Sequence, residues 1–427
     1  DDTLADTAMY YWKRDLRTNI SNEVPTNYKD PAFWQHMVTF GVGLGVTGSV
    51  NSDDAFAAIL SGATINWPDP TATNAAKLDD LLHASVNSRG GFFSASNPDE
   101  FATALSDTLT DISKRIGSAS SIAANSTSIS TNSQIFQAKF NSADWSGELE
   151  AFSVIATGVT STPAWSASNQ ISAPASRSIF TTTGGNGKEF LWNQLSATDQ
   201  ASLANQDTLN YIRGDRNKEL QNGGSFRNRA SHVLGDIVHS SPNYVKDTDT
   251  VYVGANDGML HAFDSLTGSE VFSYIPGSLM PKLAALTQPN YAHDYFVDGD
   301  IAVSTLVQSP GHNYLAASLG RGGKGLFGLD VTEPATFAPS NVLWEYTDTT
   351  NPTDLDLGFM LGRPTIAQMN DGSLAVIIAN GYNSTSGKAV LYIFDLSTGS
   401  LIKKIDTLVA GDNGLSAPGV VDSDDDG

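Results

Sequence analysis

The pattern of apolar and polar positions separates the first 116 residues from the rest of the chain. In residues 1–116, apolar residues recur at helical spacing between short apolar runs, which is typical of an α/β domain. The runs at 37–45 and 91–95 predict strands, and amphipathic segments predict helices near residues 4–12, 54–60, 76–86 and 97–116. Strand and helix therefore alternate as in a doubly wound sheet.

Further along, apolar and polar positions alternate with the period of a β-strand. Residues 134–140 and 147–154 follow this pattern. The preceding segment, 117–133, is rich in Ser, Thr and Asn, and it predicts a linker or a first edge strand. Residues 155–230 predict a less regular insertion with a helix around residues 192–203.

An internal repeat then indicates the fold. Residues 260–268 read LHAFDSLTG, residues 391–399 read LYIFDLSTG, and residues 326–332 contain a looser copy, LFGLDVT. Apolar strands and Asn-Asp-Gly or Thr-Gly turns surround each copy, as in the blades of a β-propeller. The sequence therefore predicts a mainly β protein with about five blade signals, at residues 134–154, 240–274, 300–346, 363–405 and 416 onward.

The last stretch of the sequence is the candidate for metal binding. Asp422, Asp424 and Asp426 occupy positions 1, 3 and 5 of a loop whose position 6 is Gly427, as in the first half of an EF-hand-type calcium loop. Alternate carboxylates can turn toward one Ca²⁺ ion, and glycine permits the sharp bend. A solvated acidic turn is the alternative. The loop follows the predicted opening strand of a further blade, which favours a rigid calcium site.

Two other features are candidates for contact with a partner. Arg213-Gly214-Asp215 is an integrin-type tripeptide and a candidate cell-attachment site, but its neighbours Tyr211 and Ile212 favour a packed structural turn. A basic cluster surrounds it, and we expect this cluster to pair with acidic blade loops rather than to dock a partner. Its members are Arg213, Arg216, Lys218, Arg227 and Arg229.

Composition excludes several functional classes. The chain has 427 residues, no Cys and a formal net charge of −22, which disfavours nucleic acid and anionic lipid as partners and suits divalent cations. No apolar run is long enough to span a membrane. The abundance of Ser, Thr, Asn and Gly fits a secreted bacterial protein, and Asp1 in place of an initiator Met predicts a mature or cut fragment.

No catalytic grouping is recognisable. The seven histidines, including the pair His232 and His239, lack the spacing of zinc ligands, and no Ser-His-Asp arrangement stands out. The glycine-rich segment 320–325 lacks the phosphate-loop pattern and predicts a hairpin. We therefore expect no enzymatic activity.

Several short motifs, spread over nearly the whole chain, are informative in combination. They read LADTAMYYW at 4–12, QHMVT at 35–39, LLHASVN at 81–87, DWSG at 144–147, FRNR at 226–229, LGDI at 234–237, VGANDGMLHAF at 253–263 and GLFGLDV at 325–331. In combination they resemble the PilC/PilY family of type IV pilus tip proteins. The resemblance implies the C-terminal part of a von Willebrand A-like domain at 1–116, a linker at 117–133, and a modified β-propeller at 134–427 with its insertion at 155–230.

The resemblance also implies a function and a location. The family acts in pilus biogenesis, twitching motility, virulence and surface adhesion, with calcium in a propeller loop regulating pilus extension against retraction. It implies an exported protein at the pilus tip, the outer-membrane surface or the periplasm of a Gram-negative bacterium. Minor pilins, the pilus tip complex and a host-cell receptor are the implied partners, with no nucleic acid and no membrane-spanning segment.

The chain departs from the family pattern in two respects. The Asp-x-Ser-x-Ser metal motif of a von Willebrand A domain is expected upstream of residue 1. The family propeller has about seven blades, so we expect the natural protein to continue past Gly427.

A quinone-dependent dehydrogenase is an alternative because such enzymes are also propellers, but their vicinal Cys pair is missing here. A pure minor-pilin assembly scaffold is the other alternative.

Overall fold

The computed structural model divides the chain into two compact units, residues 1–117 and 118–427. The described residues are 3–19, 22, 24, 30–44, 48–95, 118–124, 134–142, 144–155, 158–160, 162–409 and 411–420. Each unit has a buried apolar core of its own, so each can be described by itself.

The first unit is an α/β arrangement of two parallel strands and their neighbouring helices. Its elements are α1 (Leu4–Trp12), β1 (Phe40–Leu44), α2 (Ser52–Ser61), α3 (Asn74–Asn87) and β2 (Gly91–Ala95). The side chains of Thr3, Asn51 and Thr73 accept backbone N–H groups and cap these helices at their N-termini. The predicted strands and these helices are confirmed, while the helix predicted over 97–116 lies outside the described residues.

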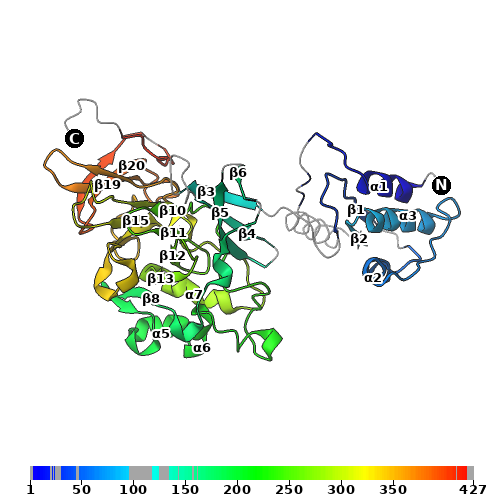
Figure 1. Cartoon of the computed structure of the whole chain (residues 1–427), viewed down its shortest axis with the longest axis horizontal. Helices are drawn as coiled ribbons and strands as arrows, with labels where there is room; N and C mark the ends of the chain where they lie inside the picture. The colour runs from blue at the N-terminus through cyan, green and yellow to red at the C-terminus, as the bar shows by residue number, and fades with distance from the viewer. Residues whose placement is uncertain are drawn as a thin grey trace. The chain divides into compact units, whose positions relative to one another are not determined.

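Within the described residues, the second unit contains four sheets of mainly antiparallel strands (Figure 1). The first consists of β3 (Ser118–Ala124), β4 (Gln134–Asn141), β5 (Ser146–Ile155), β6 (Gly158–Val159) and β7 (Trp165–Ser166). The second is built on β10 (Asn243–Val245), β11 (Thr250–Gly254), β12 (Leu260–Asp264) and β13 (Glu270–Ile275). The third consists of β14 (Ile301–Val303), β15 (Tyr314–Ser318), β16 (Gly325–Asp330) and β17 (Val342–Thr347). The fourth consists of β18 (Thr365–Gln368), β19 (Leu374–Ala379), β20 (Val390–Asp395) and β21 (Leu401–Asp406).

The first strands of successive sheets lie side by side, which gives the radial order of a propeller. β10 contacts both β3 and β14, and β14 contacts β18. Asn243 Nδ2 on β10 and Arg363 Nε, just before β18, both donate to the carbonyl of Ile301 on β14, at 3.1 and 3.2 Å. Four of the predicted blade signals, at 134–154, 240–274, 300–346 and 363–405, therefore correspond to sheets.

Two predictions about this unit need correction. Ser118–Ala124 lies in the segment predicted as a linker, but it pairs antiparallel with β4 as an edge strand, the alternative that its polar composition also allowed. The remainder, 125–133, lies outside the described residues. Ser416–Val420, predicted as the opening of a fifth blade, forms no strand, and only Leu415 makes an isolated bridge, to Gly381.

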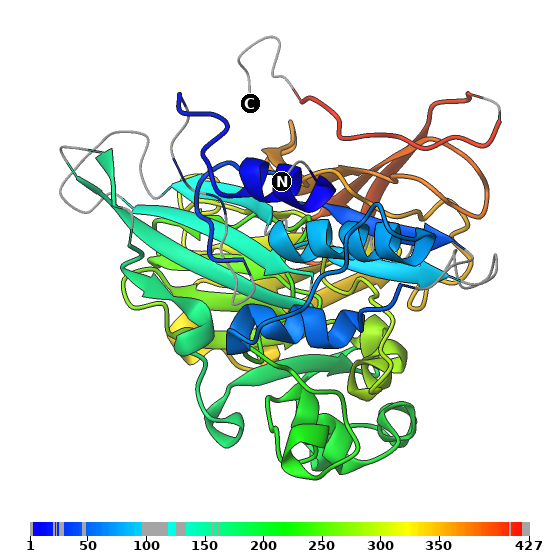
Figure 2. The ribbon, with the colours of Figure 1, turned by 90° about the vertical axis from the view of Figure 1, so that its right-hand side faces the viewer.

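The insertion is more ordered than its sequence pattern indicates. It contains the hairpin of β8 (Ile179–Thr183) and β9 (Asn186–Glu189) and the helices α5 (Ala197–Leu203) and α6 (Gln206–Ile212). β8 pairs in parallel with β13, so the hairpin extends the second sheet to six strands. Figures 1 and 2 show α5 and α6 at one end of this unit, below the sheets in both views.

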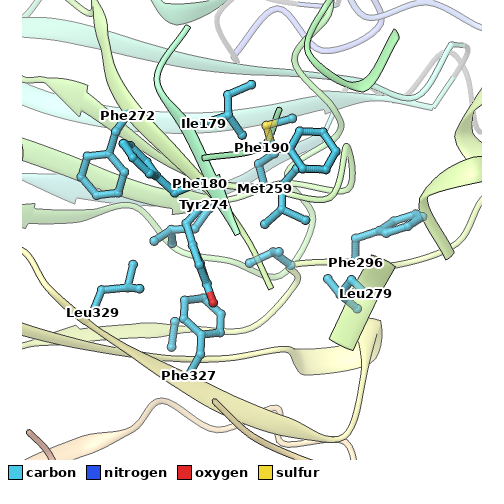
Figure 3. Close-up of a cluster of buried hydrophobic side chains, with 14 of the residues drawn as sticks. Ile179, Phe180, Phe190, Met259, Phe272, Tyr274, Leu279, Phe296, Phe327 and Leu329 are labelled. Carbon is cyan, nitrogen blue, oxygen red and sulfur yellow. The ribbon is translucent and has the colours of Figure 1, made fainter. Parts of the chain in front are cut away.

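A large apolar cluster joins the insertion to the second and third sheets (Figure 3). Phe180 comes from β8, Phe272 and Tyr274 from β13, and Phe327 from β16, and all of them are almost completely buried. At about 25 cal/mol per Å² of apolar surface, each such side chain contributes about 1.5–3 kcal/mol to folding. The insertion is therefore part of the core of this unit.

Tryptophans dock one sheet onto the turn of another. Trp165 Nε1 on β7 donates to the carbonyl of Ser265 at 2.9 Å, and its ring covers Gly268 in the second sheet. Trp344 Nε1 on β17 donates to the carbonyl of Leu396 at 2.9 Å, and its ring covers Gly399 in the fourth sheet. Both glycines belong to the Thr-Gly turns of the internal repeat, so the repeat marks the docking points between blades.

Candidate functional site

The predicted calcium ligands lie outside the described residues, so their geometry is not shown. Asp422, Asp424 and Asp426 follow a segment that is held to the fourth sheet at Leu415. The Leu415 N–H donates to the carbonyl of Gly381 at 2.9 Å, and the Gly381 N–H donates back at 3.1 Å. In the described part of the chain, no group of three or more Asp, Glu or His side chains is arranged to hold a metal ion.

The Arg213-Gly214-Asp215 tripeptide lies at the end of α6, and its arginine points into the protein. Arg213 is 6% exposed, and its guanidinium donates to the carbonyls of Phe190, Pro174 and Arg177 at 3.0, 2.9 and 2.8 Å. Gly214 is also buried and has φ of +110°, a conformation that favours glycine. This geometry favours the structural turn over a cell-attachment site, because the arginine is not presented at the surface.

Three other members of the basic cluster have acidic partners within the insertion, whereas Arg227 lies over the Tyr291 ring and its Nε and Nη1 make no hydrogen bond to a described residue. Arg229 Nε donates to Glu219 at 2.8 Å, and its guanidinium lies 3.7 Å from the centre of the Tyr211 ring. Arg216 contacts the same glutamate, and Lys218 pairs with Asp207. The internal role that the sequence favoured is the one the structure has, although these acidic partners come from the insertion rather than from blade loops.

A buried ionic network, which the sequence did not reveal, joins the insertion to the second sheet. Arg177 Nε donates to Glu270 Oε2 at 2.6 Å, and Arg177 Nη2 donates to Glu270 Oε1 at 2.7 Å. His261 on β12 lies between two carboxylates, with Nδ1 2.9 Å from Glu270 Oε1 and Nε2 3.1 Å from Asp257 Oδ2. The side chains of Arg177 and Glu270 are 2% exposed, and that of His261 is 0% exposed.

The charges in this network stabilise one another against the cost of burial. Burial disfavours the charged form of His261, but the carboxylates of Asp257 and Glu270 outweigh it and raise the pKa of the imidazole to about 9. Burial likewise acts against the Glu270 carboxylate, but the charge of Arg177 and the hydrogen bond from His261 lower its pKa. His261 is therefore a buried cation at neutral pH, closed off from substrate, and the network is suited to fixing the insertion rather than to catalysis.

A signal for this network was present in the repeat. The position of His261 is occupied by Phe327 and Tyr392 in the other copies, so a histidine at this buried position requires a polar partner. Its partners Asp257 and Glu270 lie only 4 and 9 residues away. The contact of Arg177 with Glu270 was not accessible, because Arg177 lies 93 residues before Glu270 and belongs to the insertion.

Two further histidine–carboxylate pairs lie in the loops of the same unit. His239 Nδ1 is 2.7 Å from Asp298 Oδ2, and His293 Nε2 is 2.7 Å from Asp236 Oδ2. Asn256 Nδ2 also donates to Asp236, and Trp145 stacks on His293 with ring centres 3.8 Å apart. These contacts bring together the Asp-Trp-Ser-Gly, Leu-Gly-Asp-Ile and Asn-Asp-Gly motifs, which are far apart in the sequence.

Comparisons with known proteins agree with this architecture. Residues 234–427 match the family model described as the PilY1 beta-propeller domain. The whole chain is 35% identical to the type IV pilus biogenesis factor PilY1 of Pseudomonas aeruginosa and covers 43% of that protein. A PilY1 homolog of Xylella fastidiosa is 35% identical over 76% of the chain, which covers 28% of that protein.

A solved structure is also similar. The crystal structure of the Pseudomonas aeruginosa PilY1 C-terminal domain is 39% identical to this chain, with a TM-score of 0.35. The match covers 43% of this chain and 35% of that one. The chain thus spans less than half the length of these relatives, which are named as biogenesis factors. No helix among the described residues is long and apolar enough to cross a membrane.

Proposed function

Because this chain belongs to the PilY1 family of type IV pilus biogenesis factors, we propose that it acts in pilus biogenesis as a non-enzymatic propeller component of the pilus tip. In this role it supports pilus extension and counteracts retraction. It also takes part in twitching motility and surface adhesion. The observation that carries the proposal is the 35% identity to the Pseudomonas aeruginosa factor over the entire chain. The packed blades and the enclosed position of His261 are compatible with a binding role.

The proposal is tested in a piliated bacterium that carries the gene. Deleting the gene should abolish surface pili and twitching, and the intact gene supplied in trans should restore both. A gene lacking the region that encodes residues 118–427 should not restore either. Normal piliation and twitching in the deletion strain would contradict the proposed function.

We also propose that the acidic loop binds Ca²⁺ through Asp422, Asp424 and Asp426. Their spacing and the overall negative charge support this, because hard oxygen ligands are those that Ca²⁺ prefers. Without a cation, neighbouring carboxylates in such a loop repel one another by about 1–4 kcal/mol per close pair.

Calorimetry tests the calcium site. The protein should bind Ca²⁺, and the double variant Asp422→Ala with Asp424→Ala should lose at least ten-fold in affinity. The matched control is Asp348→Ala with Asp412→Ala, which removes two exposed carboxylates elsewhere and should bind as the unmodified protein does. Equal binding by both double variants would exclude the assigned ligands.

The location and partners follow from the same family membership as proposals. We place the protein among exported components at the pilus tip, the outer-membrane surface or the periplasm, with residues 1–116 as the end of a von Willebrand A-like domain. Minor pilins of the tip complex are the proposed partners, and a host-cell receptor is a further one. Two binding measurements separate a scaffold role from an adhesive one. Capture of minor pilins by the tagged protein supports the scaffold role, and binding of the protein to host cells supports the adhesive role.

A further inference from the structure

A cavity of about 510 Å³ opens where the insertion meets the third sheet. Its walls are formed by the turn of the β8–β9 hairpin, one side of α5, the segment from Gly277 to Pro281 and strand β17 with the turn that follows it. The volume falls in the range of about 300–1,000 Å³ that is usual for small-molecule sites. The proposed pilus function and the calcium loop make no use of it.

The walls of the cavity are rich in hydroxyl groups and carry no cation. Hydroxyl-bearing side chains come from all parts of the wall, among them Thr183, Thr198, Ser202, Ser278 and Thr350. The residues that line it, all in the described part of the chain, include no Lys, Arg or His. An anionic ligand would therefore find no opposite charge, whereas a neutral ligand with many hydroxyls would find both donors and acceptors.

One polar group in the wall lacks a hydrogen-bond partner, and another accepts a long hydrogen bond. The hydroxyl oxygen of Ser278 is buried and makes no hydrogen bond to any described residue. Glu345 Oε1 accepts from the Tyr274 hydroxyl at 2.5 Å and from the Gly277 N–H at 2.7 Å. Its Oε2 accepts a long bond of 3.4 Å from the Ser278 N–H, and the Thr182 side chain also hydrogen-bonds the carboxyl. An unpaired buried polar group is destabilising, and a ligand hydroxyl could supply the missing hydrogen bond to Ser278.

Glu345 is the carboxyl group on the β17 side of the cavity. Its side chain faces the cavity from β17, and burial raises its pKa despite the hydrogen bond from Tyr274. Pro281 and Leu343 supply apolar surface on the cavity wall, against which the C–H face of a sugar ring can pack.

We propose that this cavity is a binding site for a neutral carbohydrate of one or two rings, held by the hydroxyls and carboxyl on its wall. The apolar patch would take the ring face, and Ser278 and Glu345 would bind ring hydroxyls. The proposal is independent of calcium binding and of pilus assembly, so each can fail without the other.

Saturation-transfer-difference NMR on the whole chain tests the site with glucose, galactose, N-acetylglucosamine and lactose as probes, and with glucuronate as an anionic comparison. We expect at least one neutral sugar to bind with a dissociation constant in the millimolar range or tighter, and glucuronate to bind at least five-fold more weakly. Ser202→Trp, which fills the cavity from α5, should weaken sugar binding at least ten-fold.

A variant on the same helix provides the control. Ala201 is exposed on α5 and does not line the cavity, so Ala201→Trp should bind sugar as the unmodified protein does and have the same melting temperature as Ser202→Trp. The proposal is overturned if none of the neutral sugars binds, if glucuronate binds as tightly as they do, or if Ser202→Trp binds normally.

Discussion

At the scale of single residues, the most informative side chain is His261. Its imidazole is fully buried, yet its pKa is raised to about 9 because two carboxylates face it. A group with a folded-state pKa above its unfolded value of 6.5 contributes stability that is fully present below about pH 6.5 and is lost as the pH rises toward 9. The shift corresponds to about 3 kcal/mol.

This argument predicts a pH dependence of folding. The free energy of unfolding of the propeller unit should fall by about 3 kcal/mol between pH 6.5 and 9.5. His261→Gln should be less stable at pH 6.5, because Asp257 and Glu270 lose a buried cation, and its stability should change little over the same range. Urea unfolding monitored by tryptophan fluorescence at several pH values measures both.

His312 offers the matched comparison for this prediction. It is half-exposed and lies 3.2 Å from Asp330, so His312→Gln should keep the pH dependence of the unmodified protein. If His261→Gln retained the full loss of stability above pH 6.5, the buried histidine would not be its source.

The tripeptide at Arg213 shows what a sequence motif leaves open at this scale. Its three residues are compatible with a receptor motif or with a turn, and the neighbouring apolar residues favoured the turn. The carbonyls that accept from Arg213 belong to Pro174, Arg177 and Phe190, which lie 23–39 residues earlier in the chain. Such partners could not be predicted, because local spacing carries no information about which distant carbonyls lack a donor.

At the scale of elements, local patterns predicted the strands well and the pairing between distant strands poorly. The strands on either side of LHAFD and LYIFD were predicted from the period-two pattern and tight turns, since hairpin pairing depends on residues close in sequence. The parallel pairing of β8 with β13 was not predicted, because it connects strands about 90 residues apart. The edge strand β3 was ambiguous because its Ser-rich and Ala-rich sequence has no apolar alternation.

The docking of Trp344 onto Gly399 leads to a prediction about blade packing. Gly399 has φ of +68°, and a Cβ added there would overlap the tryptophan ring. Gly399→Ala should therefore lower the free energy of unfolding by about 2–5 kcal/mol, from backbone strain of about 1–2 kcal/mol and overpacking of about 1–3 kcal/mol. Thermal or urea unfolding of the variant measures the loss.

A glycine of the same blade separates the two contributions. Gly372, in the β18–β19 turn, has φ of +83°, but a Cβ added there would meet nothing within 4 Å. Gly372→Ala should cost only the strain, about 1–2 kcal/mol. Equal losses in the two variants would show that the tryptophan does not hold the turn of the next blade.

At the scale of the whole molecule, the two units have separate cores and should unfold separately. The first unit is centred on Ala55, Leu82 and Val86, whereas the core of the second runs through its sheets and the insertion. The sequence predicted this division from the change in hydrophobic period, and the boundary between the units at residues 117 and 118 lies within one or two residues of the predicted end of the α/β part.

Calorimetry of the whole chain should accordingly show two unfolding transitions. A fragment comprising residues 118–427 should keep the propeller transition within about 2 °C, because a shift of that size corresponds to only about 1.3 kcal/mol in a domain of this length. The fragment should also retain the pH dependence assigned to His261, since all four members of the ionic network lie in the second unit. A single transition in the whole chain, or a propeller transition lowered by about 10 °C in the fragment, would show that the first unit contributes to the stability of the second.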